Sequence, residues 1–184
     1  RIFVNSGTSC YGVGAERLRQ RETAAHNTVV VKDSDSSEVW GGFRVARRAR
    51  PVGLSVDAQE DCVRVVCAHD GYTRLRGRPI HERRWILEGS DLVVEDRLIG
   101  AYQKAEARFH LHPEVQVVLD NEARSGRMNL PSGQVLTWAV DGGVVKLEES
   151  TYHPRFGQSV PNQCLVVSLE GNQPSKLHLA WTSS

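Results

Sequence analysis

The sequence contains no long hydrophobic run, no excess of either charge and no closely spaced cysteine pair. No segment approaches the ~18 consecutive apolar residues that a membrane-spanning helix needs, and residues 1–7 lack the charged and apolar regions of a signal peptide. The 23 basic and 22 acidic residues nearly cancel, so net charge gives no general attraction for a polyanion. We therefore expect no nucleic-acid or membrane partner, and any anion binding must come from local clusters.

The four cysteines show no C-x-x-C spacing of the kind that binds metals. Cys62 and Cys67 are five residues apart, which places them on opposite faces of a strand, so they cannot easily pair with each other. Pairing with Cys10 or Cys164 stays open. Buried free thiols are the favoured interpretation, because cysteine is often a small core residue.

Short apolar runs separated by Gly, Pro, Asn, Asp and Ser recur along the chain, and no long stretch keeps a helical apolar period. With 184 residues and 40% hydrophobic content, the chain can bury one substantial core. We predict an all-β fold without significant helix: a large antiparallel two-sheet β-sandwich forming a single domain over 1–184. The predicted strands cover 28–32, 38–46, 52–57, 63–68, 81–87, 92–98, 104–112, 115–119, 127–130, 135–140, 144–148, 163–169 and 176–182.

Three local patterns refine this prediction. The sequence Asp141-Gly142-Gly143 predicts a tight hairpin, and Glu88-Gly89-Ser90-Asp91 predicts another. The segment 14–21 is too short and too charged for a core helix and is predicted to be an ordered loop with about one turn. Because the chain opens inside what has the pattern of a strand, we expect it to be a fragment of a longer polypeptide.

His26 stands at the start of an apolar run, and Arg17, Arg19 and Arg21 lie within nine residues of it. A histidine near a strand start is more often structural. The nearby arginines favour an anion-handling site, and Asn27 offers hydrogen-bonding groups that could fix a ring tautomer, as a ligand or catalytic imidazole requires.

Arginines also cluster in 43–51 and 72–78. Guanidinium groups bind carboxylate and sulfate through two parallel hydrogen bonds, so such clusters suit an acidic polysaccharide. An exposed strand edge kept soluble by its charge is an equally good interpretation.

Two runs in this region resemble a known family. They are Thr-Ala-Ala-His-Asn-Thr-Val-Val-Val, beginning at Thr23, and Ser-Glu-Val-Trp-Gly-Gly-Phe-Arg-Val, beginning at Ser37. Both are similar to the β-rich C-terminal part of the bacterial heparinase II/III-like polysaccharide lyases. The resemblance covers essentially the whole chain and implies a supersandwich-like fold, an upstream α/α toroid domain in the same protein, and a periplasmic or secreted location.

Many members of that family hold zinc with two histidines and an aspartate. His26 matches the last histidine, whereas Asn5 stands where the aspartate occurs, and the H-x-H segment that carries the other histidine would precede residue 1. An amide oxygen is a weaker donor to zinc than a carboxylate. We therefore expect no cofactor in this chain alone, with zinc at His26 and Asn5 only in a full-length protein.

The resemblance also implies cleavage of uronate-containing polysaccharide by β-elimination, which needs a carboxylate-neutralising group, a base and an acid. In the family, a tyrosine and a histidine from the upstream region supply the base and the acid, so we expect no catalytic residue here and an inactive isolated domain. Arg21, Asn27, Arg44 and Tyr11 are the expected contacts to an acidic polysaccharide, with packing as the favoured role of Tyr11. The alternative is a non-catalytic carbohydrate-binding or structural β-sandwich, in which Asn5 marks real loss of the metal site.

Other polar segments have structural interpretations that compete with functional ones. His110 and His112 would share one face of a strand, as a metal-binding edge or, as we favour, a polar strand face. The segment 69–72 is either a sugar-facing loop or a turn capped by Asp70, and His153 is structural unless it faces a cleft. The four tryptophans are expected in the core rather than stacked on sugars; they are Trp40, Trp85, Trp138 and Trp181.

Overall fold

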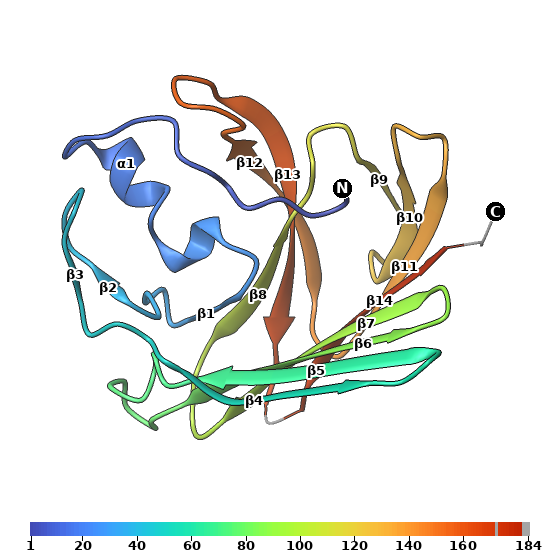
Figure 1. The fold of residues 1–184 in the computed structure, drawn as a ribbon, viewed down its shortest axis with the longest axis horizontal. Coiled ribbons are helices and arrows are strands. Elements are labelled where there is room, and N and C mark those ends of the chain that lie inside the picture. The colour runs from blue at the N-terminus through green and yellow to red at the C-terminus, as the bar shows by residue number, and fades with distance from the viewer. Residues whose placement is uncertain (172, 182–184) are drawn as a thin grey trace.

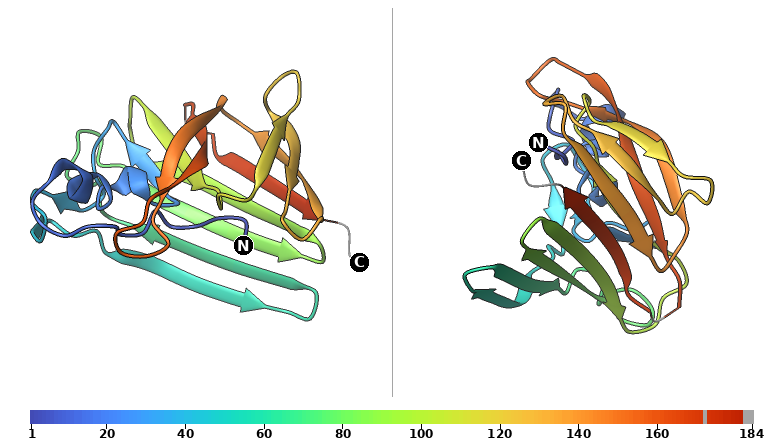
Figure 2. Two further views of the ribbon diagram at one scale, coloured as in Figure 1. Left: turned by 90° about the horizontal axis from the view of Figure 1, so that it is seen from above. Right: turned by 90° about the vertical axis from the view of Figure 1, so that its right-hand side faces the viewer.

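The computed structural model describes residues 1–171 and 173–181 as two antiparallel sheets that face each other (Figures 1 and 2). The strands are β1 (Val29–Val31), β2 (Glu38–Val39), β3 (Val45–Ala46), β4 (Pro51–Ala58), β5 (Cys62–His69), β6 (Ile80–Glu88), β7 (Asp91–Ile99), β8 (Ala105–His110), β9 (Gln116–Leu119), β10 (Ser125–Asn129), β11 (Val135–Asp141), β12 (Val145–Tyr152), β13 (Val160–Leu169) and β14 (Ser175–Trp181). One sheet has the order β1-β8-β13-β12, and the other has the order β4-β5-β6-β7-β14-β11-β10-β9. The predicted all-β, two-sheet sandwich is confirmed.

Within the described residues, helix is confined to the segment that precedes β1. It consists of the five-residue helix α1 (Ala15–Arg19) and the 3-10 turn η1 (Thr23–Ala25). Both lie beside the four-stranded sheet (Figure 1). Among the described residues, no helix has the length and apolar character needed to cross a membrane.

Most predicted strands are found, but the strand predicted over 38–46 is wrong. That segment instead forms the hairpin β2–β3, a separate two-stranded sheet in which Val39 pairs with Val45. Gly42 lies in its turn, where an added Cβ would be 1.7 Å from the carbonyl oxygen of Gly12. Only a glycine allows this close backbone approach in the turn. The last residue of the predicted strand 176–182 lies outside the described residues.

The two glycine turns have different outcomes. The hairpin at Gly89 is confirmed, because β6 and β7 pair up to Glu88 and Asp91. The hairpin predicted at 141–143 is wrong: β11 belongs to the eight-stranded sheet and β12 to the four-stranded sheet. With positive φ at Gly142 and Gly143, the chain passes from one sheet to the other. Apolar residues flank these glycines on both sides, as they would in a hairpin, so the sequence pattern alone does not distinguish the two.

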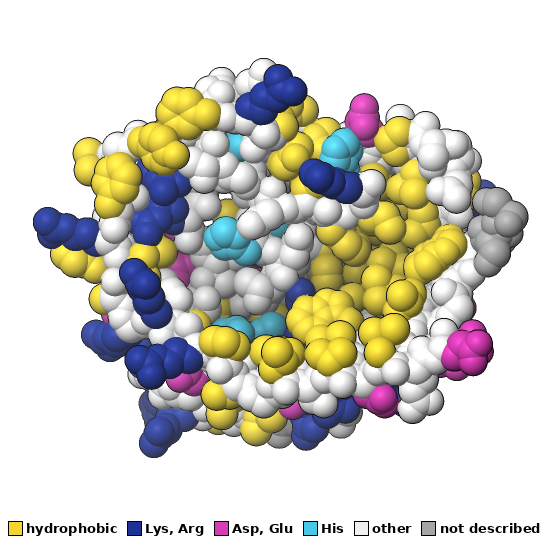
Figure 3. All heavy atoms as spheres, in the orientation of Figure 1, with side chains coloured by type: hydrophobic (Ala, Val, Ile, Leu, Met, Phe, Trp, Pro, Cys, Tyr) yellow, Lys and Arg dark blue, Asp and Glu magenta, His cyan; other side chains and the backbone are white. Residues whose placement is uncertain are grey.

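The core lies between the two sheets. The four-stranded sheet contributes Val29, Phe109 and Leu165, while the eight-stranded sheet contributes buried side chains such as Trp138 and Leu179. Burial of this apolar surface is the main stabilising term, worth roughly 25 cal/mol per Å². The larger sheet extends beyond the smaller one, and every residue of β4 is exposed. Figure 3 shows a hollow lined by hydrophobic side chains on the face seen there.

The cysteines and tryptophans only partly follow the sequence predictions. All four cysteines are free, but only Cys164 is buried. Trp138 is buried as predicted, whereas Trp40 is 59% exposed, which corrects its assignment to the core. Trp40 lies in the β2–β3 turn, on the surface, rather than inside a strand of either main sheet.

A buried polar band crosses the inner face of the larger sheet. Arg83 on β6 and Asp96 on β7 pair directly, with Nε and Nη2 donating to the two carboxylate oxygens at 2.7 and 2.8 Å. His81 Nε2 lies 2.6 Å from Asp96 Oδ1, and His81 Nδ1 lies 3.1 Å from His69 Nε2. Burial alone would raise the pKa of Asp96, but Arg83 and His81 hold it at about 2.

The hydrogen-bond directions along this band require two neutral imidazoles. The amide of Gly71 donates to His69 Nδ1 at 3.3 Å, so His69 Nε2 carries the proton and donates to His81 Nδ1. His81 Nε2 then donates to the ionised carboxylate of Asp96. Burial lowers the pKa of His69 to about 4, and the neighbouring His81 ring and the charge of Arg83 act in the same direction.

The lowered pKa of His69 makes stability depend on pH. Between about pH 6.5 and pH 4 the unfolded chain binds the proton and the folded chain does not, so the free energy of unfolding falls as pH decreases through this window. Because the ring keeps partial contact with solvent, we expect its share of the loss to be about 1 to 2 kcal/mol.

Urea unfolding between pH 7 and pH 4 measures this effect. The variant His69→Gln keeps a donor for His81 but cannot titrate, so its free energy of unfolding should fall less steeply in this window. Leu54→Ala, at an exposed side chain that cannot titrate, is the control and should keep the slope of the unmodified chain. Equal slopes in all three proteins would contradict the assignment.

Candidate functional site

His26 and Asn5 meet at the surface, although 21 residues separate them. His26 follows η1 and precedes β1, and Asn5 belongs to the N-terminal segment that pairs beside His110. The distance from His26 Nδ1 to Asn5 Oδ1 is 2.6 Å, and because an amide oxygen only accepts, Nδ1 carries the proton. Burial lowers the pKa of His26, while the nearby carbonyl of Arg21 and the charge of Asp35 oppose that shift. The ring is therefore neutral at pH 7.

The donor set around His26 does not fit zinc. A structural or catalytic zinc ion takes three or four ligands from thiolate, imidazole and carboxylate groups. Here His26 is joined by one neutral amide, whose oxygen already accepts the Nδ1 proton. Within 1–171 and 173–181, no group of three or more His, Cys, Asp or Glu side chains is placed to hold a metal ion. We therefore assign no chemistry to a metal at this position.

Arg21 links His26 to the β2–β3 hairpin. Its guanidinium donates to the carbonyl oxygen of Gly41 in the hairpin turn, and its own carbonyl lies near the His26 ring. The side chain predicted as a substrate contact thus holds the hairpin beside the histidine.

An exposed cluster of aromatic and arginine side chains continues from this hairpin. Tyr11 is 67% exposed, and its ring centroid lies 5.0 Å from that of Phe156 and 6.4 Å from that of Phe43. The guanidinium of Arg17 lies 5.5 Å from the centre of the Tyr11 ring. We call this set, with Trp40 and Arg44, the aromatic–arginine cluster.

Arg44 is exposed, and its guanidinium lies 4.9 Å from the centre of the Trp40 ring. A guanidinium over an aromatic face is held by cation–π attraction while its N–H groups stay available to an anion. Figure 3 shows Lys and Arg side chains gathered among hydrophobic ones on the side of the molecule where Figure 1 places α1, β2 and β3, with few acidic side chains. This face can bind an acidic ligand.

Asn27 is the predicted substrate contact whose surroundings indicate a structural role. Its Nδ2 donates to the carbonyl of Val4 at 3.0 Å, and its Oδ1 accepts from the amide of His110 at 2.6 Å. Both ends of the side-chain amide therefore hold backbone segments together. The sequence pattern around His26 could not distinguish this from ligand binding.

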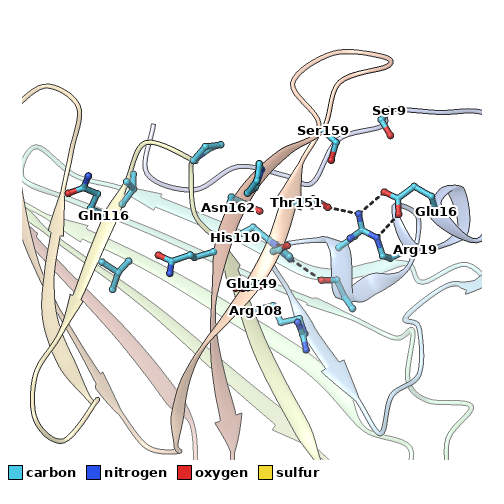
Figure 4. Close-up of a pocket in the computed structure, with 18 residues that line it drawn as sticks. Ser9, Glu16, Arg19, Arg108, His110, Gln116, Glu149, Thr151, Ser159 and Asn162 are labelled. Carbon is cyan, nitrogen blue, oxygen red and sulfur yellow. Dashed lines mark hydrogen bonds and ion pairs between the residues drawn. The ribbon is translucent and has the colours of Figure 1, made fainter.

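A groove of about 1340 Å³ lies between α1 and strands β8, β12 and β13 (Figure 4). At one end, Arg19 donates to Glu16 at 2.7 Å and to Thr151 at 2.5 Å. Arg108, farther along, pairs with Glu148 at 3.1 Å. Arg19 and the two terminal nitrogens of Arg108 already have partners within the chain, whereas Arg44 at the His26 face is exposed, so we place the candidate site there.

Three other histidines and the 69–72 turn are structural. His110 is 3% exposed, with its nitrogens 3.2 Å from Ser150 Oγ and 2.9 Å from the carbonyl of Ala24. His112 lies 3.6 Å from Glu114. His153 is also buried, next to Arg19, Gln20 and the carbonyl of Gln158. Tyr72 is fully buried and donates to the carbonyl of Val29, so it does not face a sugar.

Comparison with known proteins identifies the class. The profile of the heparinase II/III-like C-terminal family matches residues 1–180, and the chain therefore belongs to this polysaccharide lyase family. The heparan sulfate lyase HepC from Pedobacter heparinus aligns with a TM-score of 0.77 and 15% identity, over 100% of this chain and 29% of that chain. A heparinase III gene product aligns with a TM-score of 0.77 and 14% identity, over 100% and 28%. No curated protein matches.

These structural relatives share the fold at low identity, and this chain spans less than a third of their length. The polar band of Arg83, Asp96 and the two histidines was missed at the level of sequence. A signal was present: the alternation Val94, Asp96, Leu98 places a carboxylate on an otherwise apolar strand face.

The donor set leads to a prediction about zinc. We expect the chain, purified after incubation with excess zinc and then dialysed, to retain well under one equivalent by elemental analysis. A chelator should leave its thermal unfolding midpoint unchanged, because the fold does not rest on a metal. Stoichiometric zinc that disappears in His26→Ala would contradict this, with His112→Ala as the control.

Proposed function

We propose that this chain is the β-sandwich part of a lyase that cleaves uronate-containing acidic polysaccharide by β-elimination. Membership of the heparinase II/III-like family supports the reaction class. The observation that carries the proposal is the surface on which the His26–Asn5 pair, Arg21 and the aromatic–arginine cluster come together: Arg21 donates to the carbonyl of Gly41, the residue next to Trp40.

The chemistry of elimination explains why such a surface is useful. Removal of the proton beside a uronate carboxyl group places negative charge on that group, and cationic donors fixed in advance stabilise it. Arg44 is exposed and positioned over Trp40, so it can neutralise a carboxylate or sulfate. The faces of exposed rings such as Tyr11 and Phe156 offer apolar platforms for sugar rings.

His26 contributes a neutral imidazole with a defined tautomer. With the proton on Nδ1 bonded to Asn5, the ring is held in one orientation toward the substrate. We assign the base and the acid of the elimination to parts of a longer polypeptide, including an upstream α/α toroid, and expect this chain alone to be inactive. Zinc binding would likewise need ligands from outside these residues. We place the protein in the periplasm or outside the cell.

The names of the two relatives favour a sulfated glycosaminoglycan as the class of substrate. HepC is a heparan sulfate lyase, and the other relative is a heparinase III gene product. The arginines of the aromatic–arginine cluster suit both sulfate and carboxylate groups.

A second function is favoured by one observation. Asn5 occupies the position expected for a zinc-binding carboxylate and makes a direct hydrogen bond to His26 instead. In this alternative, the chain is a non-catalytic carbohydrate-binding or structural β-sandwich. The two functions differ in one product: only the lyase creates an unsaturated uronate.

The lyase is tested by incubating the full-length polypeptide with a panel of acidic polysaccharides and measuring the absorbance of unsaturated uronate. We expect activity that falls about tenfold in His26→Ala, because the Nε2 acceptor of the oriented ring, which can bind a sugar hydroxyl, is lost. Arg44→Ala should lose about tenfold, which corresponds to one charge-assisted hydrogen bond. Arg97→Ala, on the outer face of β7, is the matched control and should keep full activity.

Normal activity in His26→Ala would remove the central role of this residue. Binding of acidic polysaccharide without any unsaturated product, across the whole panel, would support the non-catalytic alternative.

The aromatic–arginine cluster makes a separate prediction for binding. Tyr11→Ala and Phe156→Ala should each weaken the binding of an acidic oligosaccharide about fivefold, because one stacking platform is lost, worth about 1 kcal/mol. Calorimetric titration measures this effect. Leu54→Ala, which removes a 68% exposed apolar side chain from β4, is the control. Equal affinities in all variants would show that the rings do not contact the ligand.

A further inference from the structure

The buried guanidinium of Arg83 joins the larger sheet to the segment that carries His26. Two of its nitrogens are taken up by Asp96, while the third, Nη1, donates to the carbonyl oxygen of Asn27 at 2.6 Å. Asn27 follows His26 directly and precedes β1 of the smaller sheet. One planar side chain therefore spans the space between the two sheets and ends at the candidate site.

The side chain of Asn27 extends this connection to the other half of the pair. Its Nδ2 donates to the carbonyl of Val4, the residue before Asn5, and its Oδ1 accepts the amide of His110 at the end of β8. The residue after His26 is thus fastened to the residue before Asn5. The relative position of His26 and Asn5 therefore depends on these backbone contacts as well as on the hydrogen bond between the two side chains.

The surroundings hold Arg83 in one orientation. Asp96 is 1% exposed and accepts from both Arg83 and His81, so its carboxylate cannot rotate without losing a bond. The Arg83 guanidinium also lies 5.1 Å from the centre of the Phe109 ring on the opposite sheet. Because a guanidinium is planar, fixing two of its nitrogens also fixes the direction in which the third nitrogen donates.

Stability alone does not account for this arrangement. Removing a guanidinium and a carboxylate from water is costly, and well-packed apolar side chains of similar volume often stabilise a core as well or better. The rest of the inner face of β7 is apolar, with Val94 and Leu98 on either side of Asp96. What an apolar pair could not provide is a directed donor to the Asn27 carbonyl.

We propose that Arg83, anchored by Asp96, and Asn27 are positioning residues that hold His26 and Asn5 in their mutual geometry. The catalytic importance of this geometry rests on the proposed lyase function, whereas the positioning itself does not. Neither residue touches the substrate; both act through the backbone on either side of the pair.

Amide hydrogen exchange of the 184-residue chain, followed by NMR, tests the positioning. The amides of Val4 and Thr28 report on it, since they donate to the carbonyls of His110 and His26. Arg83→Lys keeps the positive charge but loses the planar guanidinium that bonds to Asp96 and the Asn27 carbonyl together. Hydrogen exchange at the amides of Val4 and Thr28 should therefore be at least tenfold faster. The amide of Leu165, in the core, should exchange as in the unmodified chain.

Arg84→Lys is the matched control. Arg84 is the next residue on β6, points to the opposite face and pairs with Glu82. Its substitution should leave Val4 and Thr28 unaffected. Unchanged exchange at Val4 and Thr28 in a folded Arg83→Lys, or an equal change in Arg84→Lys, would overturn the proposal.

A second variant covers the case in which Arg83→Lys does not fold. Asn27→Ala leaves the buried ion pair intact and removes only the bonds to Val4 and His110, so it should accelerate exchange at Val4 while Leu165 stays protected. Global unfolding of both variants would also overturn the proposal, because a positioning residue leaves the sandwich intact.

Turnover of the full-length polypeptide connects positioning to function. In Arg83→Lys, kcat should fall at least tenfold while KM stays within twofold, since the aromatic–arginine cluster is unchanged. A full-length polypeptide without any lyase activity would refute the proposed function and leave the exchange result standing. Loss of kcat without any change in exchange would refute the positioning mechanism instead.

Discussion

The structure depends on closing two sheets of unequal width over one apolar core. The smaller sheet supplies Val29, Phe109 and Leu165 to this core. The larger sheet has more strands, and it can bury only those that lie opposite the smaller sheet. The segments that carry the His26–Asn5 pair are attached to the smaller sheet: the N-terminal segment, η1 and the start of β1. The position of the site relative to the rest of the molecule therefore depends on contacts across the space between the sheets, where apolar packing alone is not directional.

The buried polar band supplies the direction that packing lacks. Hydrogen bonds have fixed lengths and angles, so a guanidinium bonded to Asp96 on one sheet and to the Asn27 carbonyl on the other sets both separation and register. The band also accounts for His69 and His81: His81 donates to the buried carboxylate of Asp96, and His69 orients His81. The same set of hydrogen bonds thus orders the interior and connects it to the His26 face.

Most strands could be predicted from the sequence, because alternation and turn residues mark them locally. The wrong strand and hairpin predictions concern segments whose structure is determined by tertiary contacts. Nothing local distinguishes the change of sheet at Gly142 from a hairpin, and the turn of the β2–β3 hairpin packs Gly42 against the Gly12 backbone, which is distant in the sequence. In the same way, the pairing of His26 with Asn5 was accessible only through family resemblance, since 21 residues separate them. The structural roles of Asn27 and Arg21 depend on backbone partners that no sequence pattern names.

The uncovered end of the larger sheet has a consequence for solubility. Strand β4 is the outermost strand, and its unpaired backbone groups could extend the sheet by adding a strand from another molecule. The pairing of β4 with β5 is interrupted between Val52 and Ser55, where Gly53 takes a positive φ, and Pro51 opens the strand without an N–H group. These features bend the edge and remove a donor from it, which makes it a poor template for intermolecular pairing. The irregularity that looks like a defect in the sheet therefore protects an apolar edge from aggregation.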